Sequence, residues 1–437
     1  MKYLLLFLLP ITLSAQEWQP LFQENLDNFR QLGGTADYDL KDGVLIGTTE
    51  HDIPNSFLAT KKTYSDFILE FEVLIEVGMN SGVQFRSQWN AERGYVYGYQ
   101  CEIETSDRRW AGGIYDEARR GWLYPVTRNE AGRGAFRNGT WNHYRIEAIG
   151  PQLRTFVNGV PVANLVDDRT AEGFIAFQVH SIGPNDRAGQ RVQWRNARIL
   201  TENLSEQRSV ASVPPEVNYL NNRLTEHEQR TGWRLLWDGS TTKGWENAFP
   251  ADPTARVWTV KDENLQPGKR NADLVTRQQF QNFELIADVR LPDGAATGIV
   301  YRAHPEMRML NGNFVRLEYH LSTLPEEGTG PVRGLQSTGA LYGLIPPKNL
   351  TEPTRKDLRF KSGQFNRVRI VAENGRIEHW LNDIKVLEYD YHSQLFDVAV
   401  RYSDFGAAEN YGIFDTGRIL LRHAPGVEFR NIRIREW

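Results

Sequence analysis

The stretch Ser81-Gly82-Val83-Gln84-Phe85-Arg86 alternates apolar and polar side chains like a strand, and it occurs twice in this chain. Its second copy is Thr297-Gly298-Ile299-Val300-Tyr301-Arg302. Three further landmarks repeat in the same order at nearly constant separation: 111–115 with 338–342, 141–146 with 365–370, and 192–199 with 427–434. The repeating unit is far longer than the roughly 20–50 residues of a solenoid repeat. The sequence therefore predicts two tandem copies of a whole domain.

Most of the chain between these landmarks has the pattern of short strands. Segments such as 67–73 and 144–148, and the second-copy segment 283–289, are apolar or alternating over strand lengths and are bounded by turns such as Asn158-Gly159. Many short strands without interleaved helices predict an all-β antiparallel sandwich in each copy. The formal charge of −4 gives no support for a nucleic-acid or anionic-membrane partner.

The first residues have the pattern of a secretory signal. Lys2 precedes an apolar run over 4–13, and a small-residue cleavage site ends at Ala15 before Gln16. We therefore expect residues 1–15 to be removed and the protein to be periplasmic or secreted. No cysteine follows the cleavage site, so no lipoprotein anchor is expected. The sole cysteine, Cys101, cannot form an internal disulfide and is expected to be a buried, inert thiol.

The domain limits follow from the repeat and from local composition. The two domains are expected at 17–200 and 231–437. Residues 201–230 are polar and contain Pro214-Pro215, and they predict a linker with a short helix over 218–230.

Several motifs are similar to those of one known family. The openings at 18–22 and 233–239, the segments 80–86, 98–100 and 338–343, and the closing 429–434 resemble the 3-keto-disaccharide hydrolase domain, long catalogued as a domain of unknown function. The resemblance covers both halves. It implies two tandem concanavalin-like jelly-roll sandwiches, secretion, and action on sugars oxidised at C3. Such folds also serve as plain carbohydrate binders, so the motifs are more specific for the family than for activity.

Strand alternation indicates where chemistry could lie. In the segments 81–86, 99–104 and 174–180 the apolar residues share one face, and the other face carries amides, carboxylates, a guanidinium and an imidazole but no lysine. If these strands are neighbours, one sheet presents all of these groups on its concave face; the alternative is an ordinary solvated sheet face. The predicted catalytic residues are Arg86, Glu102, Glu104 and His180, and the predicted substrate-binding residues are Asn80, Gln84, Gln100, Tyr115 and Gln178.

The second copy keeps a polar face of different chemistry. Aligned on the repeat, Glu102 and Glu104 correspond to Glu318 and His320, and Arg86 corresponds to Arg302. These three second-copy residues are therefore further candidates for substrate binding. In the same alignment Val300 replaces Gln84, Arg316 replaces Gln100, and His423 matches His180 with an offset of one residue. The second domain is expected to be a site of another specificity or a binding module.

The chemistry that the family implies suits these groups. A ketone at C3 acidifies the hydrogen on C2, so a general base can remove it and the glycosidic oxygen can leave C1 by β-elimination. Addition of water to the enone completes a net hydrolysis. Glu102, Glu104 or His180 could be the base or the acid, and Arg86 could hold the enolate oxygen. The sequence requires no cofactor, although a carboxylate–histidine cluster could hold a divalent metal.

Two other functions stay open. Glu102 and Glu104 on one strand face could approach the separation of about 5–5.5 Å that retaining glycosidases use. Against this, Asp107 falls off the strand register, and the second copy has only Glu318 at these positions. The other alternative is a non-catalytic, lectin-like binder. The expected partner is a carbohydrate, without nucleic acid or membrane anchor, and the oligomeric state is not indicated.

Overall fold

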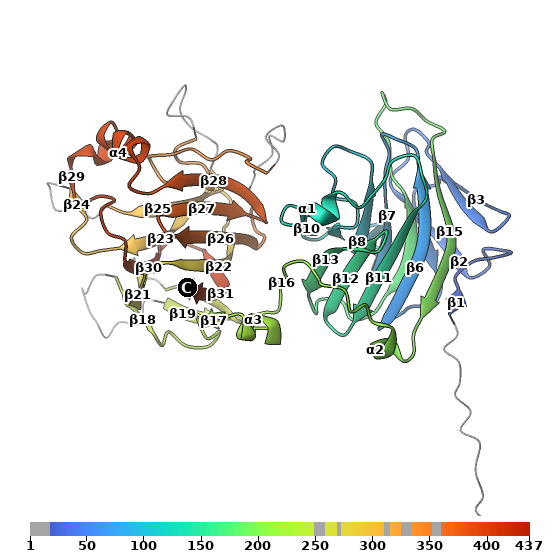
Figure 1. Ribbon diagram of the computed structural model, residues 1–437, viewed down its shortest axis with the longest axis horizontal. Helices are drawn as coiled ribbons and strands as arrows, with labels where there is room; N and C mark the ends of the chain where they lie inside the picture. The colour runs from blue at the N-terminus through green and yellow to red at the C-terminus, as the bar shows by residue number, and fades with distance from the viewer. Residues whose placement is uncertain (1–17, 249–257, 269–271, 310–314, 325–333, 352–359) are drawn as a thin grey trace, which may run out of the picture. The chain divides into compact units, whose positions relative to one another are not determined.

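The computed structural model describes residues 18–248, 258–268, 272–309, 315–324, 334–351 and 360–437, so the expected signal segment lies outside the described residues. The chain divides into two compact units, seen in Figure 1. Of the described residues, the N-terminal unit comprises those of 18–121, 129–164 and 168–215, and the C-terminal unit comprises those of 122–128, 165–167 and 216–437.

Two sheets contain the strands of the N-terminal unit, and their strands pair antiparallel apart from one short parallel contact of β16 with β13. Of these strands, β16, residues 122–124 of β10 and residues 165–166 of β13 are counted with the C-terminal unit. The order of the first sheet is β16-β13-β12-β11-β6-β15-β4-β3, with β1 added to β15. Its strands are β1 Gln19–Pro20, β3 Asp37–Lys41, β4 Val44–Thr48, β6 Phe67–Ile75, β11 Asn142–Ile149, β12 Gln152–Val157, β13 Val160–Val166, β15 Arg191–Leu200 and β16 Val217–Asn218.

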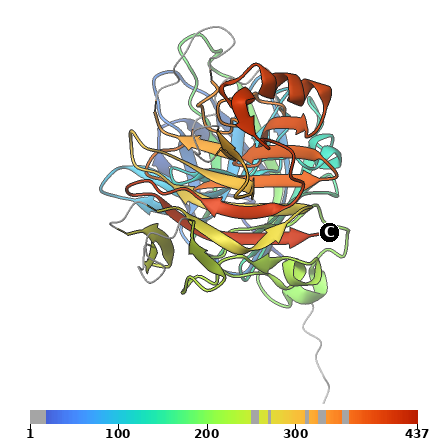
Figure 2. The ribbon, with the colours of Figure 1, turned by 90° about the vertical axis from the view of Figure 1, so that its left-hand side faces the viewer.

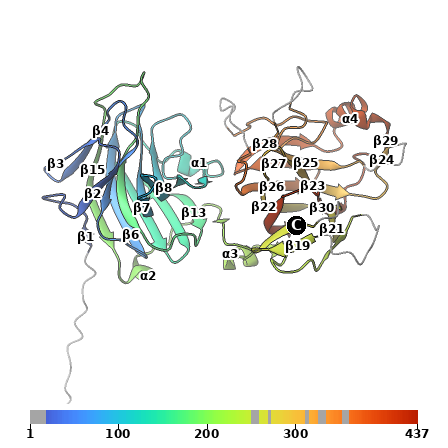
Figure 3. The same cartoon turned by 180° about the vertical axis from the view of Figure 1, so that it is seen from behind.

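The second sheet of this unit has the order β10-β9-β8-β7-β14-β5-β2 and carries the candidate site. Its strands are β2 Phe29–Gly33, β5 Ser56–Thr60, β7 Asn80–Asn90, β8 Tyr95–Glu104, β9 Ile114–Glu117, β10 Gly121–Tyr124 and β14 Phe174–Val179. Figure 3 shows β7 and β8 of this sheet from behind.

Aromatic side chains from both sheets fill the space between them. Phe177 of the second sheet packs edge-on against Phe71 and Trp194 of the first, with ring centroids 6.4 and 5.4 Å apart. Phe71 in turn stacks on Tyr144 at 5.2 Å. Rings of this size each bury a large apolar area, which is the main favourable term in folding. Cys101 also lies in this core, as expected, and burial raises the pKa of its thiol well above the usual range.

The C-terminal unit repeats the two-sheet plan. The larger sheet has the order β19-β20-β31-β22-β26-β27-β28, with β17 on β31, and Figure 2 shows several of these strands side by side. The smaller sheet has the order β18-β21-β30-β23-β25. The strands of these two sheets are β17 Arg234–Leu235, β18 Trp245–Asn247, β19 Trp258–Lys261, β20 Asn264–Pro267, β21 Leu274–Phe280, β22 Phe283–Arg290, β23 Ala296–Ala303, β25 Leu317–Ser322, β26 Asn366–Glu373, β27 Arg376–Leu381, β28 Ile384–Asp390, β30 Gly417–Leu421 and β31 Glu428–Glu436. Two further short strands, β24 Arg308–Met309 and β29 Ala408–Glu409, pair only with each other.

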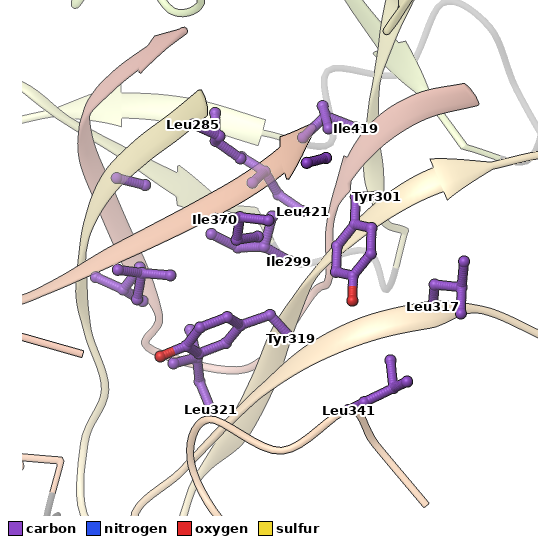
Figure 4. Packing of buried hydrophobic residues seen from close by; sticks show 14 of the residues in the cluster. Leu285, Ile299, Tyr301, Leu317, Tyr319, Leu321, Leu341, Ile370, Ile419 and Leu421 are labelled. Carbon is purple, nitrogen blue, oxygen red and sulfur yellow. The ribbon is translucent and has the colours of Figure 1, made fainter. Parts of the chain in front are cut away.

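The core of the C-terminal unit lies between these two sheets, as Figure 4 shows. Leu285 and Ile370 come from the larger sheet, and Ile299, Tyr319 and Leu421 come from the smaller one. Each of these side chains is at most 1% exposed. Every second residue of β23 and β25 points into this core, so the residues between them face the other way. The predicted fold class, all-β with two tandem jelly-roll sandwiches, is confirmed.

Helices are few and short in the described residues: α1 Glu130–Arg133, α2 Leu204–Gln207, α3 Glu226–Arg230, α4 Gln394–Arg401 and the 3₁₀ turn η2 Asp404–Ala407. The helix expected over 218–230 is confined to α3. It starts late because Asn218 belongs to β16, and because Thr225 caps the helix in a capping box with Glu228. None of the helices in the described part of the chain has the length and apolarity to span a bilayer.

Each domain contains a bulge at the arginine of the repeated motif. The pairing of β7 with β8 shifts register between Phe85 and Gln88, and the pairing of β23 with β30 shifts between Val300 and Ala303. Arg86 and Arg302 adopt left-handed φ angles of 46° and 52°, which non-glycine residues seldom do. A glycine packs against each of these backbones: a Cβ on Gly173 would lie 2.4 Å from the Arg86 carbonyl carbon, and one on Gly417 would lie 2.3 Å from that of Arg302.

Candidate active site

The candidate site lies on the face of the second N-terminal sheet that points away from the core. Antiparallel pairing sets Gln84 opposite Gln100, Gly82 opposite Glu102, and Asn80 opposite Glu104. On the other side of β7, Ala176 of β14 pairs with Gln84. The alternate residues of these strands, including Val83, Cys101 and Phe177, are core residues with no exposed surface. The even-numbered residues therefore share the opposite face.

This polar face is not an ordinary solvated one. The exposed fractions of Gln84, Gln100, Glu102, Glu104 and Gln178 all lie between 0 and 4%. A solvated sheet face would leave such long polar side chains in water, where their burial cost would not arise. Burial of so many polar groups on the face opposite the core is typical of a binding or catalytic site.

Hydrogen bonds connect the buried amides to Glu102. Asn80 Nδ2 donates to Glu102 Oε1 at 2.7 Å, and Gln100 Nε2 donates to Glu102 Oε2 at 3.2 Å. Gln84 Nε2 donates to Gln100 Oε1 at 2.8 Å, and the hydroxyl of Ser87 donates to Gln84 Oε1 at 2.7 Å. The chain of amides fixes the orientation of the Glu102 carboxyl group.

A cation that strand alternation does not predict completes the group. Arg108 Nη2 lies 3.2 Å from Glu102 Oε1 and 2.5 Å from Glu104 Oε2, so one guanidinium contacts both carboxylates. Glu104 also accepts from the Ser106 hydroxyl and from the Trp110 backbone N–H. Arg108 follows β8 in an irregular segment, where the period of two no longer applies. In the sequence, only the position of Arg108 four residues after Glu104 indicates that the two side chains could form an ion pair.

Burial perturbs Glu102 strongly. Desolvation raises the pKa of Glu102 from 4.5 to about 7; Arg108 opposes the shift and Glu104 adds to it. A carboxyl group that titrates near neutral pH can both take up and release a proton, which suits general acid–base catalysis. Glu117, which sequence reasoning missed, has its pKa raised to about 7 by burial and by Asp116.

The remaining N-terminal candidates come from β9, from β14 and from the residue that follows β14. Tyr115 pairs with Gln100 across β8 and β9, and Glu117 pairs with Gly98, so both share the polar face. Gln178 is completely buried, and neither of its amide atoms has a hydrogen-bond partner within the described residues. His180 directly follows β14 and is partly exposed, and its Nδ1 lies 2.6 Å from the Ser181 carbonyl oxygen. Because a carbonyl can only accept, Nδ1 carries the proton and Nε2 of the neutral ring is an acceptor.

The expectation that Arg86 joins this group is wrong. Its guanidinium donates to the carbonyl oxygens of Ser65 and Gly150 at 2.6 and 2.7 Å and to the Asp66 carboxylate at 2.8 Å. At the bulge Arg86 adopts a left-handed φ, which redirects its side chain, so alternation counted from Gln84 fails at this residue. Arg302 is also 1% exposed, but it lies over the Tyr391 ring at 4.2 Å and its Nη1 is 3.9 Å from the Asp415 carboxylate. Its Nε and Nη1 have no hydrogen-bond partner within the described residues. The contacts of Arg86 give it a structural role, whereas substrate binding by Arg302 stays a prediction.

The structure also corrects the match between the two copies. Gly298 pairs with His320 as Gly82 pairs with Glu102, and Val300 pairs with Glu318 as Gln84 pairs with Gln100. His320 therefore occupies the place of Glu102, and Glu318 occupies the place of Gln100. The sequence alignment was two residues out because it had no strand pairing to anchor it. By the same registers Arg422 takes the place of Gln178, and His423 does not correspond to His180.

A hollow of about 700 Å³ lies on the first sheet of the N-terminal unit, lined among others by Trp18, Glu70 and His143. Glu70 there forms ion pairs with Arg145 and Arg198 at 2.7 and 2.6 Å, so its charge is already compensated. Within the described residues, no three His, Cys, Asp or Glu side chains are grouped so as to hold a metal ion.

Comparison with known proteins places the chain in a family. The family model of the 3-keto-alpha-glucoside-1,2-lyase-like domain matches residues 17–200 and again 232–435. A curated protein of Bacteroides thetaiotaomicron, named 3-keto-disaccharide hydrolase, is 26% identical over an alignment of 241 residues that covers 47% of this chain and 78% of that protein.

Two solved structures are also similar. A putative glycosyl hydrolase from Parabacteroides distasonis has 24% identity and a TM-score of 0.43, covering 50% of this chain and 99% of its own. A carbohydrate-binding module from Bacillus subtilis has 16% identity and a TM-score of 0.29, covering 40% and 95%. The family model accounts for nearly all of both halves. The chain belongs to the 3-keto-alpha-glucoside-1,2-lyase-like domain family and carries two copies of that domain in tandem.

Proposed function

We propose that this protein is a carbohydrate-active enzyme that cleaves 3-keto-glycosides by removing the proton on C2 and eliminating the group on C1. Family membership and the name of the Bacteroides relative support the substrate class. The observation that carries the proposal is Glu102, a buried carboxyl group with a pKa of about 7, held among amides on the polar face of the N-terminal domain.

Each step has a candidate group in this domain. The carboxylate of Glu102 takes the C2 proton, and the electrons of the C–H bond form the C1–C2 double bond as the C1–O bond breaks. Arg108, whose side chain is 24% exposed, is the cation that stabilises negative charge on the C3 oxygen, the role expected of Arg86. His180 is the second proton-transfer group and serves the departing oxygen. Addition of water to the enone then gives the net hydrolysis.

The test uses a 3-keto-glucoside and the same glucoside without oxidation. The enzyme should cleave only the ketone, because only the ketone makes the C2 hydrogen acidic. Deuterium at C2 should slow cleavage or be lost to solvent. Equal cleavage of both substrates without exchange at C2 would replace the proposal with a nucleophilic glycosidase. Binding without any cleavage would replace it with a lectin.

The role of Glu102 is tested with Glu102→Gln, which is nearly isosteric and opens no cavity. We expect the cleavage that depends on the N-terminal domain to be lost while the circular dichroism spectrum is unchanged. Glu92→Gln, at an exposed position of the same domain, is the matched control. An unchanged total rate in Glu102→Gln would remove this residue from the chemistry.

A further inference from the structure

The C-terminal domain contains a buried charged cluster that takes no part in the reaction proposed for the N-terminal domain. Glu318 and His320 of β25 have side chains only 4 and 6% exposed. His320 Nδ1 lies 2.9 Å from Glu318 Oε1, and Arg422 Nη1 donates to both oxygens of Glu318 at 2.9 and 3.0 Å. The His320 ring also packs against that of Tyr342, with centroids 4.9 Å apart.

The cluster occupies the same sheet positions as the N-terminal site. His320 stands at the register position of Glu102, Glu318 at that of Gln100, and Arg422 at that of Gln178. The backbone repeats as well: His320 N donates to Ala340 O at 3.0 Å, as Glu102 N donates to Gly113 O. Tyr342 and Tyr115 are equivalent in the repeated motif. One proton-accepting group in this position has thus been exchanged for another.

The contact with Glu318 determines that Nδ1 of the His320 imidazole carries a proton. A carboxylate can only accept, so the proton between the two groups belongs to His320 Nδ1. In the neutral ring Nε2 then has a free lone pair, and within the described residues it has no hydrogen-bond partner. Arg422 compensates the charge of Glu318. A carboxylate that orients an imidazole, with the other nitrogen left free, is the arrangement that proton-abstracting histidines require.

We propose that the C-terminal domain is a second, independently working catalytic site in which His320 Nε2 removes the proton. This inference rests on the proposed function, because its substrate is the same class of 3-keto-glycoside. The C2 proton passes to Nε2, the C–H electrons form the C1–C2 double bond, and the C1–O bond breaks with its electrons going to the departing alcohol. The substrate's own ketone makes this possible, so no other reactant is needed. Glu318 is a positioning residue.

The two sites differ in their surroundings. Val300 takes the place of Gln84, and Leu420 takes that of Ala176; with Val275 they form a small buried apolar cluster. The amide chain that orients Glu102 therefore has no counterpart around His320. Orientation of the base depends instead on the ion-paired Glu318, which predicts that this carboxylate matters more to the second site than Gln100 does to the first.

The experiment compares four full-length proteins on a nitrophenyl 3-keto-α-glucoside: the natural chain, Glu102→Gln, His320→Gln and the double variant. We expect each single variant to keep part of the cleavage, and the double variant to fall at least about 100-fold below either single variant, which is the lower range for loss of a general base. His423→Gln, a neighbouring histidine outside the cluster, should cleave at the natural rate.

The outcomes separate the two proposals. No cleavage by the natural chain would overturn the proposed function together with this inference. Cleavage that Glu102→Gln alone abolishes would overturn this inference and leave the proposed function standing. A residual rate in Glu102→Gln that His320→Gln does not reduce would also overturn it.

A second readout distinguishes catalysis from a structural role. In the Glu102→Gln background, His320→Ala should lose its residual cleavage and regain it when imidazole is added to the solution, since the imidazole can occupy the vacated space. Glu318→Gln in the same background should lower kcat and leave KM nearly unchanged. Failure of imidazole to restore cleavage in a folded His320→Ala protein would count against the proton-abstracting role.

Discussion

At the scale of single residues, the site depends on a carboxyl group held where its charge is unfavourable. Glu102 accepts hydrogen bonds from Asn80, Gln100 and Arg108, yet desolvation outweighs them and raises its pKa to about 7. Ordinary stabilisation would favour a neutral side chain at this position. A protein that keeps a poised acid in a buried place gives up some stability for function.

The cost of Glu102 should be visible as pH-dependent stability. Below pH 4.5 the group is protonated in both the folded and unfolded states; between pH 4.5 and about 7 only the unfolded state releases its proton. The free energy of unfolding should therefore fall as the pH rises through this window, by at most about 3 kcal/mol from this residue. Glu102→Gln should lose that contribution and gain stability relative to the natural chain at pH 8, but not at pH 4.

Urea unfolding of both proteins at pH 4 and pH 8 measures the difference. Comparison between variants removes the contribution of Glu117, which is the same in both. The exposed Glu92→Gln should show no such difference between the two pH values. If the free energies of unfolding of Glu102→Gln and the natural chain differ by the same amount at pH 4 and pH 8, the prediction is contradicted.

At the scale of elements, strand alternation predicted most of the site and failed where a strand is irregular. Gln84, Gln100, Glu102 and Glu104 share one face because β7 and β8 are regular up to Phe85. Arg86 lies outside the group because it adopts a left-handed φ at a bulge, and the period of two does not predict a bulge. The correspondence of Glu102 with His320 needed strand pairing, which a single sequence does not provide.

The bulges themselves depend on the glycines packed against them. Gly173→Ala would bring a methyl group to 2.3 Å from the Ser87 carbonyl oxygen, and Gly417→Ala would bring one to 2.3 Å from the Arg302 carbonyl carbon. These are backbone atoms and cannot turn aside. Each substitution should lower the free energy of unfolding by roughly 1–3 kcal/mol or more, as overpacking does.

Urea unfolding measures these losses, with Gly134→Ala as the control. A Cβ on Gly134 has its nearest neighbour at 3.7 Å, an ordinary contact, and its φ of −85° suits alanine. That variant should stay within about 0.5 kcal/mol of the natural chain. Loss of stability in Gly134→Ala equal to that of Gly173→Ala would show that crowding at the bulge is not the cause.

At the scale of the whole molecule, the start of the chain predicts export. In a Gram-negative host the protein should be recovered from the periplasm or medium, and its mass should correspond to a first residue of Gln16. Leu6→Arg places a charge in the apolar run and should hold the uncleaved protein in the cytoplasm. Cytoplasmic recovery of the natural chain with residues 1–15 intact would contradict this prediction.

Within one short motif, the left-handed arginine that both domains contain is required by the fold, whereas the residue two positions earlier belongs to the polar face of the site. Arg86 and Arg302 have similar left-handed φ angles, 46° and 52°, and the same burial. Gln84 and Val300, two residues earlier, differ completely in chemistry, since one is an amide and the other is apolar. In two copies of one domain, a position that the fold requires can thus stay the same while a position in the neighbouring site changes its chemistry. A shared backbone conformation at this arginine is therefore evidence of a shared fold and not, by itself, of a shared activity.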